Sequence, residues 1–366
     1  MPFLSLRPVH EGLTEPILRS IKDLMETGAF TNGPAVVEFE QAFARYCGRT
    51  HCVGVSSGLD ALRLALIASG LERGDRVLVP AQTFVATFEA VTQSGGIPVP
   101  VDVSEEDYNL DPAAVAVAVD ERTRFMVPVH LYGQLADMNA LDGIARRNEI
   151  VIVEDAAQAH GARRDGWGVG GGKAAAFSFY PGKNLGAIGD AGALVTDDAR
   201  LADTATALRE HGQIAKYRHA YEGWTARLDT IQAIVLLHKL PLLDAWNDER
   251  RSIAAAYSDL LRSVGDLRLP SVAPRSEPVW HLYVVRTGRR DDLAAFLRDR
   301  GIQTGVHYPD PPPFVPPYAH LGYPRGSFPV AEALAAEALS LPIFPGMTEA
   351  QIVSVTSAIA AFYSRA

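Results

Sequence analysis

Cysteine is scarce in this chain of 366 residues, which contains only Cys47 and Cys52. Two thiols are too few for a disulfide framework, and without further thiols they do not make a cysteine zinc site. No apolar run approaches the roughly 18 residues that a membrane helix requires. The first residues also lack the basic start and long apolar stretch of a secretory signal. We therefore expect a cytoplasmic protein that does not enter a membrane.

Long basic stretches are missing as well. The formal net charge is −9, and the basic residues form no run longer than paired arginines, which argues against nucleic-acid binding. The ten histidines show no His-Glu-x-x-His or other paired-ligand spacing, so we expect no metal site. A nicotinamide enzyme is also disfavoured, because the glycine-rich stretch 166–173 precedes an apolar run where a dinucleotide loop would follow one.

Short apolar runs alternate with helical patterns through most of the chain. This rhythm predicts an α/β protein with a mostly parallel, seven-stranded sheet and helices on both faces. The composition changes after residue 245, and the remainder is expected to form a smaller α+β domain, so we divide the chain into residues 1–245 and 246–366. The expected strands are 52–55, 76–81, 97–103, 124–130, 150–154, 174–179 and 192–196.

One lysine lies in a tight turn directly after an expected buried strand. Ser178 precedes Lys183, and Gly182 and Gly186 flank it. Most lysines are solvated at the surface, and this reading stays open for Lys183 taken alone. A partly desolvated amine can form a Schiff base with a carbonyl compound, which makes Lys183 a candidate nucleophile.

An acidic residue, Asp155, ends another apolar run. Open α/β sheets place ligand-binding groups at the carboxyl ends of their strands, so Asp155 and Lys183 are expected to face one crevice. Pyridoxal 5'-phosphate (PLP) requires such a pair: a lysine that holds it as an imine, and a carboxylate that keeps the pyridine nitrogen protonated. The alternative is that Asp155 only caps a helix.

Two further segments supply what PLP would also need. The stretch 53–62 reads as a strand, a turn containing Ser57, Gly58 and Leu59, and a helix whose first amides would face an anion. Ser178 adds a hydroxyl. Phe84, at the end of another strand, is placed to stack on a ring, although a helix cap at Ser57 and a core phenylalanine at Phe84 are the plain alternatives.

Together these segments resemble the nucleotide-sugar aminotransferases of the DegT type. These are PLP enzymes of fold type I, in the aspartate aminotransferase superfamily. The likeness extends over nearly the whole chain. Besides the segments above, it rests on the motifs at 31–34, 39–40, 127–134, 227–229, 232–233, 307–309 and 339–342.

The resemblance implies a role for each matching residue. Lys183 is implied to be the Schiff-base lysine and proton shuttle, and Asp155 the partner of the pyridine nitrogen. Gln158 is implied to lie near the ring hydroxyl, and Phe84 to stack on the ring. The residues implied to surround the phosphate are Ser57, Gly58, Leu59 and Ser178.

At three places the chain departs from its relatives. Leu59 stands where many relatives have threonine, and the sequence Gly-Leu-Asp-Ala-Leu resembles the branch that aminates C3 of a 3-keto sugar. Thr225 stands where relatives usually carry an asparagine that reaches the phosphate of the neighbouring subunit. Pro313 and Val315 replace a histidine and a glutamine, so contacts to the sugar or nucleotide are expected to differ.

The implied substrate is itself anionic and needs local partners on this acidic chain. Lys216 and Tyr217 lie in a polar loop that approaches the nucleotide sugar in relatives, and His307 and Tyr308 are further candidates. A solvated loop is the alternative for Lys216 and Tyr217. Relatives build each site from two chains, so the resemblance also implies a homodimer.

The resulting hypothesis is a transaminase with ping-pong kinetics. Glutamate would give its amino group to the cofactor, and a nucleotide-linked keto-sugar, with dTDP as the expected nucleotide, would accept it at C3 in preference to C4. One alternative is a PLP-dependent sugar dehydratase of the same fold, which Lys183 disfavours because such enzymes carry histidine there. Another is a regulatory or sensor protein that binds PLP without turnover.

Overall fold

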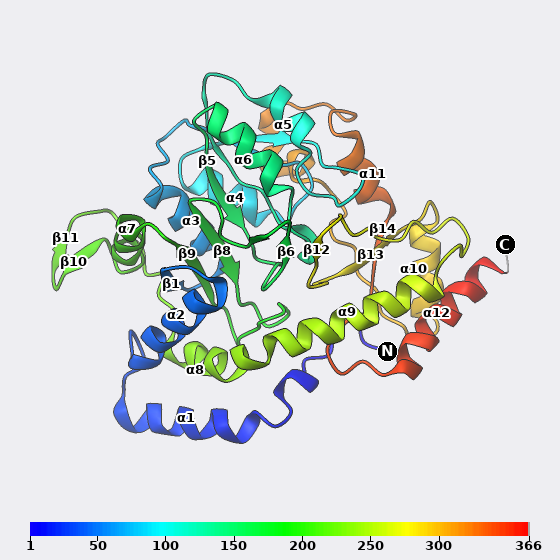
Figure 1. The fold of residues 1–366 in the computed structure, drawn as a ribbon, viewed down its shortest axis with the longest axis horizontal. Coiled ribbons are helices and arrows are strands. Elements are labelled where there is room, and N and C mark those ends of the chain that lie inside the picture. Colours follow the sequence, from blue (N-terminus) through cyan, green and yellow to red (C-terminus); the bar gives the residue numbers. More distant parts are fainter. Residues whose placement is uncertain (365–366) are drawn as a thin grey trace.

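Seven strands form the central sheet of the protein, which confirms the predicted fold class (Figure 1). The computed structural model describes residues 1–364. In spatial order the strands are β1 (His51–Val55), β9 (Gly192–Thr196), β8 (Ala174–Ser178), β5 (Val151–Asp155), β4 (Thr123–Met126), β2 (Arg76–Pro80) and β3 (Ile97–Val101).

The sheet is parallel except around β9. Strands β3, β2, β4, β5 and β8 pair in parallel, whereas β9 is antiparallel to both β8 and β1. All five residues of β9 are buried. A strand covered on both faces has no polar side to present, which explains why these strands read as continuous apolar runs in the sequence.

Helices cover both faces of this sheet. Along β8, Ala174 and Ala176 belong to a core with helices α3, α4 and α7, while Ala175 and Phe177 belong to a core with α2 and α8. This alternation follows from the two-residue period of a strand. Helices α5 and α6 extend the second layer. The bounds are α2 (Pro34–Cys47), α3 (Gly58–Ala68), α4 (Ala86–Gln93), α5 (Pro112–Ala118), α6 (Met138–Arg147), α7 (Ala199–Arg209) and α8 (Thr230–Lys239).

The C-terminal part has its own core around an antiparallel strand pair, β13 (Tyr283–Arg286) and β14 (Ala338–Leu341). Trp280 has a φ of 44°, which interrupts the extended backbone, and β13 begins only at Tyr283. The long helix α9 (Leu243–Leu260) contributes Leu243 to the core of the sheet and Ile253 to the C-terminal core. The division at residue 245 stays a prediction. The remaining helices here are α10 (Arg290–Arg298), α11 (Pro329–Glu337) and α12 (Glu349–Tyr363).

Two peripheral elements extend from the body of the molecule in Figure 1. These are the helix α1 (Thr14–Thr27) and the hairpin of β10 (Gln213–Ala215) and β11 (Arg218–His219). No helix in residues 1–364 has both the length and the apolar character to cross a bilayer. A second small sheet contains β6 (Arg163–Arg164), β7 (Trp167–Gly168) and β12 (Ser276–Glu277). Short 3-10 helices occupy Pro8–His10, Leu131–Gly133, Leu240–Leu242, Pro312–Phe314 and Pro316–Leu321.

Candidate active site

A cavity of about 320 Å³ lies at the carboxyl ends of β5 and β8. Asp155 ends β5 and Ser178 ends β8, so the parallel sheet brings both to the same edge. All the predicted cofactor-binding residues except Thr225 line this one cavity. They are Ser57, Gly58, Leu59, Phe84, Asp155, Gln158, Ser178 and Lys183.

The first turn of α3 forms one wall of the cavity. Ser57 is the N-cap, and its Oγ accepts a hydrogen bond of 3.1 Å from the amide of Asp60. The first amides of a helix have no acceptor within the helix, so those of Gly58 and Leu59 are available to an anion. A Cβ at position 58 would lie 2.6 Å from Cβ of Ser178. Glycine therefore lets the helix start approach β8 closely, and the wall fits a phosphate group.

The carboxylate of Asp155 is held entirely by hydrogen-bond donors. Its Oδ2 accepts from Oγ1 of Thr87 at 2.8 Å, and its Oδ1 accepts from the amide of Ala157 at 3.2 Å. The hydroxyl of Thr87 is in turn 2.9 Å from that of Thr83, and both threonines are buried. A carboxylate facing the cavity fits the protonated nitrogen of a pyridine ring. Thr87 lies three residues after Phe84, and no local pattern marked it as a site residue.

Lys183 lines the same cavity; the residue as a whole is half-buried, and its amine is largely removed from water. Burial lowers the pKa of its amine to about 8, against an opposite but smaller effect of Asp155. The histidines around Lys183 are weaker bases than its amine. Burial, followed by the charge of Lys183, lowers the pKa of His160 to about 3 and that of His307 to about 4. At neutral pH the lysine therefore lies among uncharged imidazoles.

The turn that carries Lys183 is tied to both neighbouring helices. Asn184 is buried, and its Nδ2 donates to Oδ1 of Asn247 in α9 at 2.9 Å and to the carbonyl of Val279 at 2.8 Å. Lys239 of α8 donates from Nζ to the carbonyl of Gly186 at 2.7 Å. Nothing in the local sequence pattern indicated these long-range contacts, which fix the position of the lysine turn.

The candidate substrate residues fall into two groups. Tyr308 lines the cavity, and together with Lys183 and His307 it also lines an adjoining space of about 220 Å³. Lys216 and Tyr217 lie at the exposed end of the β10–β11 hairpin and do not line either space. Their roles stay predictions.

Thr225 also lies outside the cavity of its own chain. Its Oγ1 is 3.1 Å from Nε2 of His211, and the backbone at 225 forms an antiparallel bridge with Glu210. Thr225 is predicted to contact the phosphate bound in a neighbouring subunit. Contacts within one chain do not test this, so the role stays a prediction.

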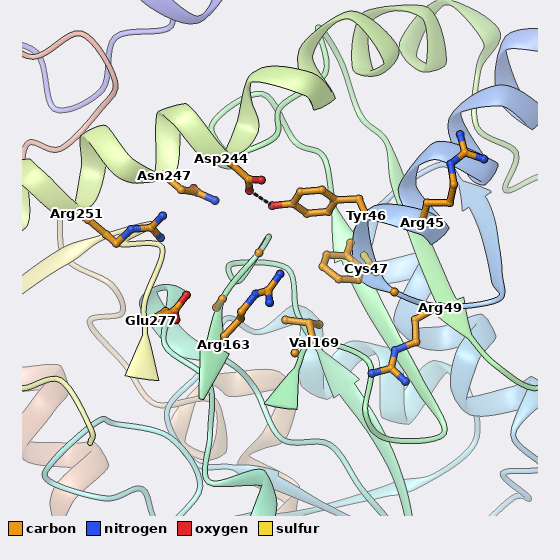
Figure 2. A pocket seen from close by; sticks show the side chains of 15 residues that line it. Arg45, Tyr46, Cys47, Arg49, Arg163, Val169, Asp244, Asn247, Arg251 and Glu277 are labelled. Atoms are coloured by element: carbon orange, nitrogen blue, oxygen red, sulfur yellow. Dashed lines mark hydrogen bonds between the residues drawn. The ribbon is translucent and has the colours of Figure 1, made fainter. Parts of the chain in front are cut away.

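A larger cavity of about 590 Å³ lies on the other face of the sheet (Figure 2). Phe177 lines it, whereas the next residue, Ser178, lines the cavity of Lys183, and successive residues of a strand point to opposite faces. No lysine occurs among the described residues that line it. Tyr46 donates to Asp244 across it at 2.7 Å, and Arg251 pairs with Asp248 at 2.6 Å. This cavity therefore lacks the lysine that a Schiff base with PLP requires.

A model of the DegT/DnrJ/EryC1/StrS aminotransferase family matches residues 12–360. The chain belongs to this family. The erythromycin biosynthesis sensory transduction protein EryC1 of Saccharopolyspora erythraea is 48% identical, over 95% of this chain and 95% of its own. The dTDP-3-amino-3,4,6-trideoxy-alpha-D-glucose transaminase of Streptomyces venezuelae is 47% identical, over 98% of this chain and 95% of its own.

A solved structure is also very similar along the whole chain. The crystal structure of S. venezuelae DesV in complex with a ketimine intermediate superposes with a TM-score of 0.97 at 46% identity, covering 100% of this chain and 99% of that one. The predicted family, the aminotransferase assignment and the PLP cofactor are thereby confirmed. The role of each site residue remains a prediction that the geometry above supports.

Proposed function

We propose that this protein transfers an amino group from glutamate to C3 of a dTDP-linked 3-keto deoxysugar. The observation that carries the proposal is the meeting of Lys183 and Asp155 in one cavity, in a chain of this aminotransferase family. Support for the sugar comes from the relatives' names. Transaminases named for dTDP-3-amino sugars are 47%, 41% and 44% identical to this chain.

The proposed chemistry divides between the cofactor and the chain. PLP, when bound, supplies an electron-withdrawing ring that stabilises negative charge on the reacting carbon. Asp155 would hold the proton on the ring nitrogen, and the first turn of α3 would hold the phosphate. Lys183 would provide the amine that binds the cofactor. Once displaced, its Nζ would take the proton from the donor's Cα and return it, a base role that suits a pKa of about 8.

A second copy of the chain would complete the site. Among the described residues lining the cavity, Lys183 is the one lysine or arginine, while Asp155 and Asp190 are acidic. A carboxylate donor and a nucleotide diphosphate need further cations. We propose that these come from the hairpin of the partner in a homodimer, with Lys216 as the first candidate and with Thr225 near the phosphate.

A panel of nucleotide sugars tests this proposal. Purified protein loaded with PLP is mixed with glutamate, and the absorbance should change from the Schiff-base band to that of pyridoxamine phosphate. Only a dTDP-linked 3-keto sugar should then restore the first band. Restoration by 4-keto sugars alone would overturn the C3 assignment, and a donor other than glutamate would overturn the choice of donor.

A regulatory function without turnover is a second candidate. It is favoured by two relatives' names, the sensory transduction protein EryC1 at 48% identity and the pleiotropic regulatory protein of Geobacillus stearothermophilus at 44%. Lys183 and Asp155 would hold PLP in either case, so the response of the bound cofactor to an amino donor distinguishes the two functions. A stable Schiff-base band that no amino donor changes would favour the regulator.

A further inference from the structure

We propose that Tyr308 is a hydrogen-bond donor to an oxygen atom of the molecule held beside Lys183, and that Gln158 sets the direction of this donor. The inference rests on the proposed function, because it assigns a contact to the reacting molecule in the same cavity. The hydrogen bonds that run from Tyr132 through Gln158 to Tyr308 determine where the hydroxyl hydrogen of Tyr308 points.

The amide of Gln158 has a fixed orientation. The backbone N–H of Tyr132 donates to Oε1 of Gln158 at 2.7 Å, so this end of the amide is the oxygen. The other end, Nε2, then donates to Oη of Tyr308 at 3.1 Å. A flipped amide would set two N–H groups against each other at the Tyr132 contact. The phenol oxygen of Tyr308 is therefore an acceptor in this pair, and its own hydrogen is left over.

No described residue accepts that hydrogen. Within residues 1–364, the Tyr308 hydroxyl makes one hydrogen bond, which it accepts from Gln158. Tyr308 also lines both the cavity of Lys183 and the adjoining space. A hydroxyl that accepts from one side and faces open space on the other directs its hydrogen into that space. The hydrogen of Tyr308 thus points to where a ligand would lie.

The ring of Tyr308 is also held in place. Its centroid lies 5.4 Å from that of Phe84 and 5.5 Å from that of His307. Nε2 of Gln82 donates to the Tyr308 carbonyl at 3.1 Å, and the hydroxyl of Tyr132 donates to the His307 carbonyl. Burial raises the pKa of Tyr308, and the nearby Asp155 adds to this, so the hydroxyl stays protonated at neutral pH. A rigid, neutral donor results.

The acceptor is an oxygen that carries negative charge or becomes negative. Nε2 of Gln158 has a second hydrogen, so Gln158 and Tyr308 present two donors from atoms 3.1 Å apart. Paired donors of this kind suit an anionic oxygen. Two molecules offer one: the ring oxygen of PLP and the keto oxygen of the sugar. The experiment distinguishes them.

The test compares Tyr308→Phe with Tyr132→Phe in the full-length protein. Tyr132→Phe is the matched control, because the Tyr132 hydroxyl anchors the same loop through the His307 carbonyl. PLP affinity is measured by absorbance titration of the apoprotein, and the Schiff-base band is followed against pH. The rate with the keto-sugar is measured separately, and melting temperatures check that both variants fold.

If the ring oxygen of PLP is the acceptor, Tyr308→Phe weakens PLP binding about tenfold. It also raises the pH midpoint of the Schiff-base band by about one unit, because the Tyr308 hydroxyl would stabilise the negative charge on the ring oxygen that remains when the Schiff base loses its proton. If the keto oxygen is the acceptor, PLP binding is unchanged and only kcat with the sugar falls about tenfold. Either result supports the donor.

The inference is overturned if Tyr308→Phe leaves affinity, midpoint and rate within twofold of the parent. It is equally overturned if Tyr132→Phe reproduces every effect, because the hydroxyl of Tyr308 would then only help to hold the loop. Should the parent protein show no transamination, the proposed function fails, while the PLP titrations still decide whether Tyr308 is a donor to the cofactor.

Discussion

Thr87 donates a hydrogen bond of 2.8 Å from Oγ1 to Oδ2 of Asp155. The other oxygen, Oδ1, accepts from the amide of Ala157, so both oxygens of this carboxylate are held in fixed directions. A threonine that makes this contact need not touch the cofactor to matter, since it would orient the carboxylate toward the ring nitrogen in the proposed role of Asp155. Oγ1 of Thr83 lies 2.9 Å from Oγ1 of Thr87, and Thr83 lines the cavity.

Replacing Thr87 with Val is expected to weaken PLP binding about tenfold or more. The variant keeps the shape of the side chain but removes a hydrogen bond to a charged group, which contributes about 1.5–3 kcal/mol. Thr87→Ser keeps the hydroxyl and should bind PLP almost as the parent does. An absorbance titration of the apoprotein measures both. Equal affinity for the Val variant and the parent would show that Asp155 is oriented without Thr87.

Gly58→Ala is expected to destabilise the protein and to weaken PLP binding. The added Cβ would lie 2.6 Å from Cβ and 3.1 Å from Cα of Ser178, so α3 must shift away from β8. Overpacking of this kind costs about 1–3 kcal/mol. Gly168→Ala is the control, since a Cβ there meets nothing within 4 Å. Thermal melts with and without PLP compare the two, and similar melting temperatures would refute the close approach.

Asn184→Ala should loosen the turn that carries Lys183. The change leaves two buried acceptors, the carbonyl of Val279 and Oδ1 of Asn247, without the donor Nδ2 of Asn184, at about 1–3 kcal/mol for each group. We expect a lower melting temperature and slower attachment of PLP to Lys183. Asn148→Ala, at the end of α6, serves as the surface control. A normal attachment rate in Asn184→Ala would mean that the turn holds its shape alone.

The attachment of PLP to the apoprotein should be pH-dependent, because only the neutral amine of Lys183 attacks a carbonyl. With a pKa of about 8, the rate is expected to rise through pH 8 and to level off above it. Between pH 8 and the ordinary lysine value of 10.5 the unfolded chain binds more protons at this group. Its contribution to the stability of the apoprotein therefore increases with pH over that range. Stopped-flow absorbance measures the rate, and a midpoint near 10.5 would contradict the burial of the amine.

Much of the fold and most of the residues that line the candidate site were predictable from the sequence. The buried parallel strands are continuous apolar runs, and Asp155 and Ser178 end two of them, so their meeting at one edge of the sheet follows from local pattern. Lys183 was found through the same reasoning and through the family resemblance. Each of these signals is carried by residues close together in the chain.

Contacts between distant segments were not predictable. Three hydrogen bonds of the site join residues far apart in the chain, and hydrophobic periodicity does not indicate such partners. They join Thr87 to Asp155, Asn184 to Asn247, and Gln158 to Tyr308. The start of β13 at Tyr283 follows the positive φ of Trp280, a backbone conformation that the apolar pattern does not indicate. The role of Thr225 depends on a second chain, which a single sequence does not place.

The most direct test of the account is the absorbance of the PLP-loaded protein through both half-reactions. Glutamate should convert the Schiff-base band to that of pyridoxamine phosphate, and a dTDP-linked 3-keto sugar should restore it, with Lys183→Ala inactive in both. A parent protein whose band ignores glutamate and every other amino donor would contradict transamination and leave the regulatory function.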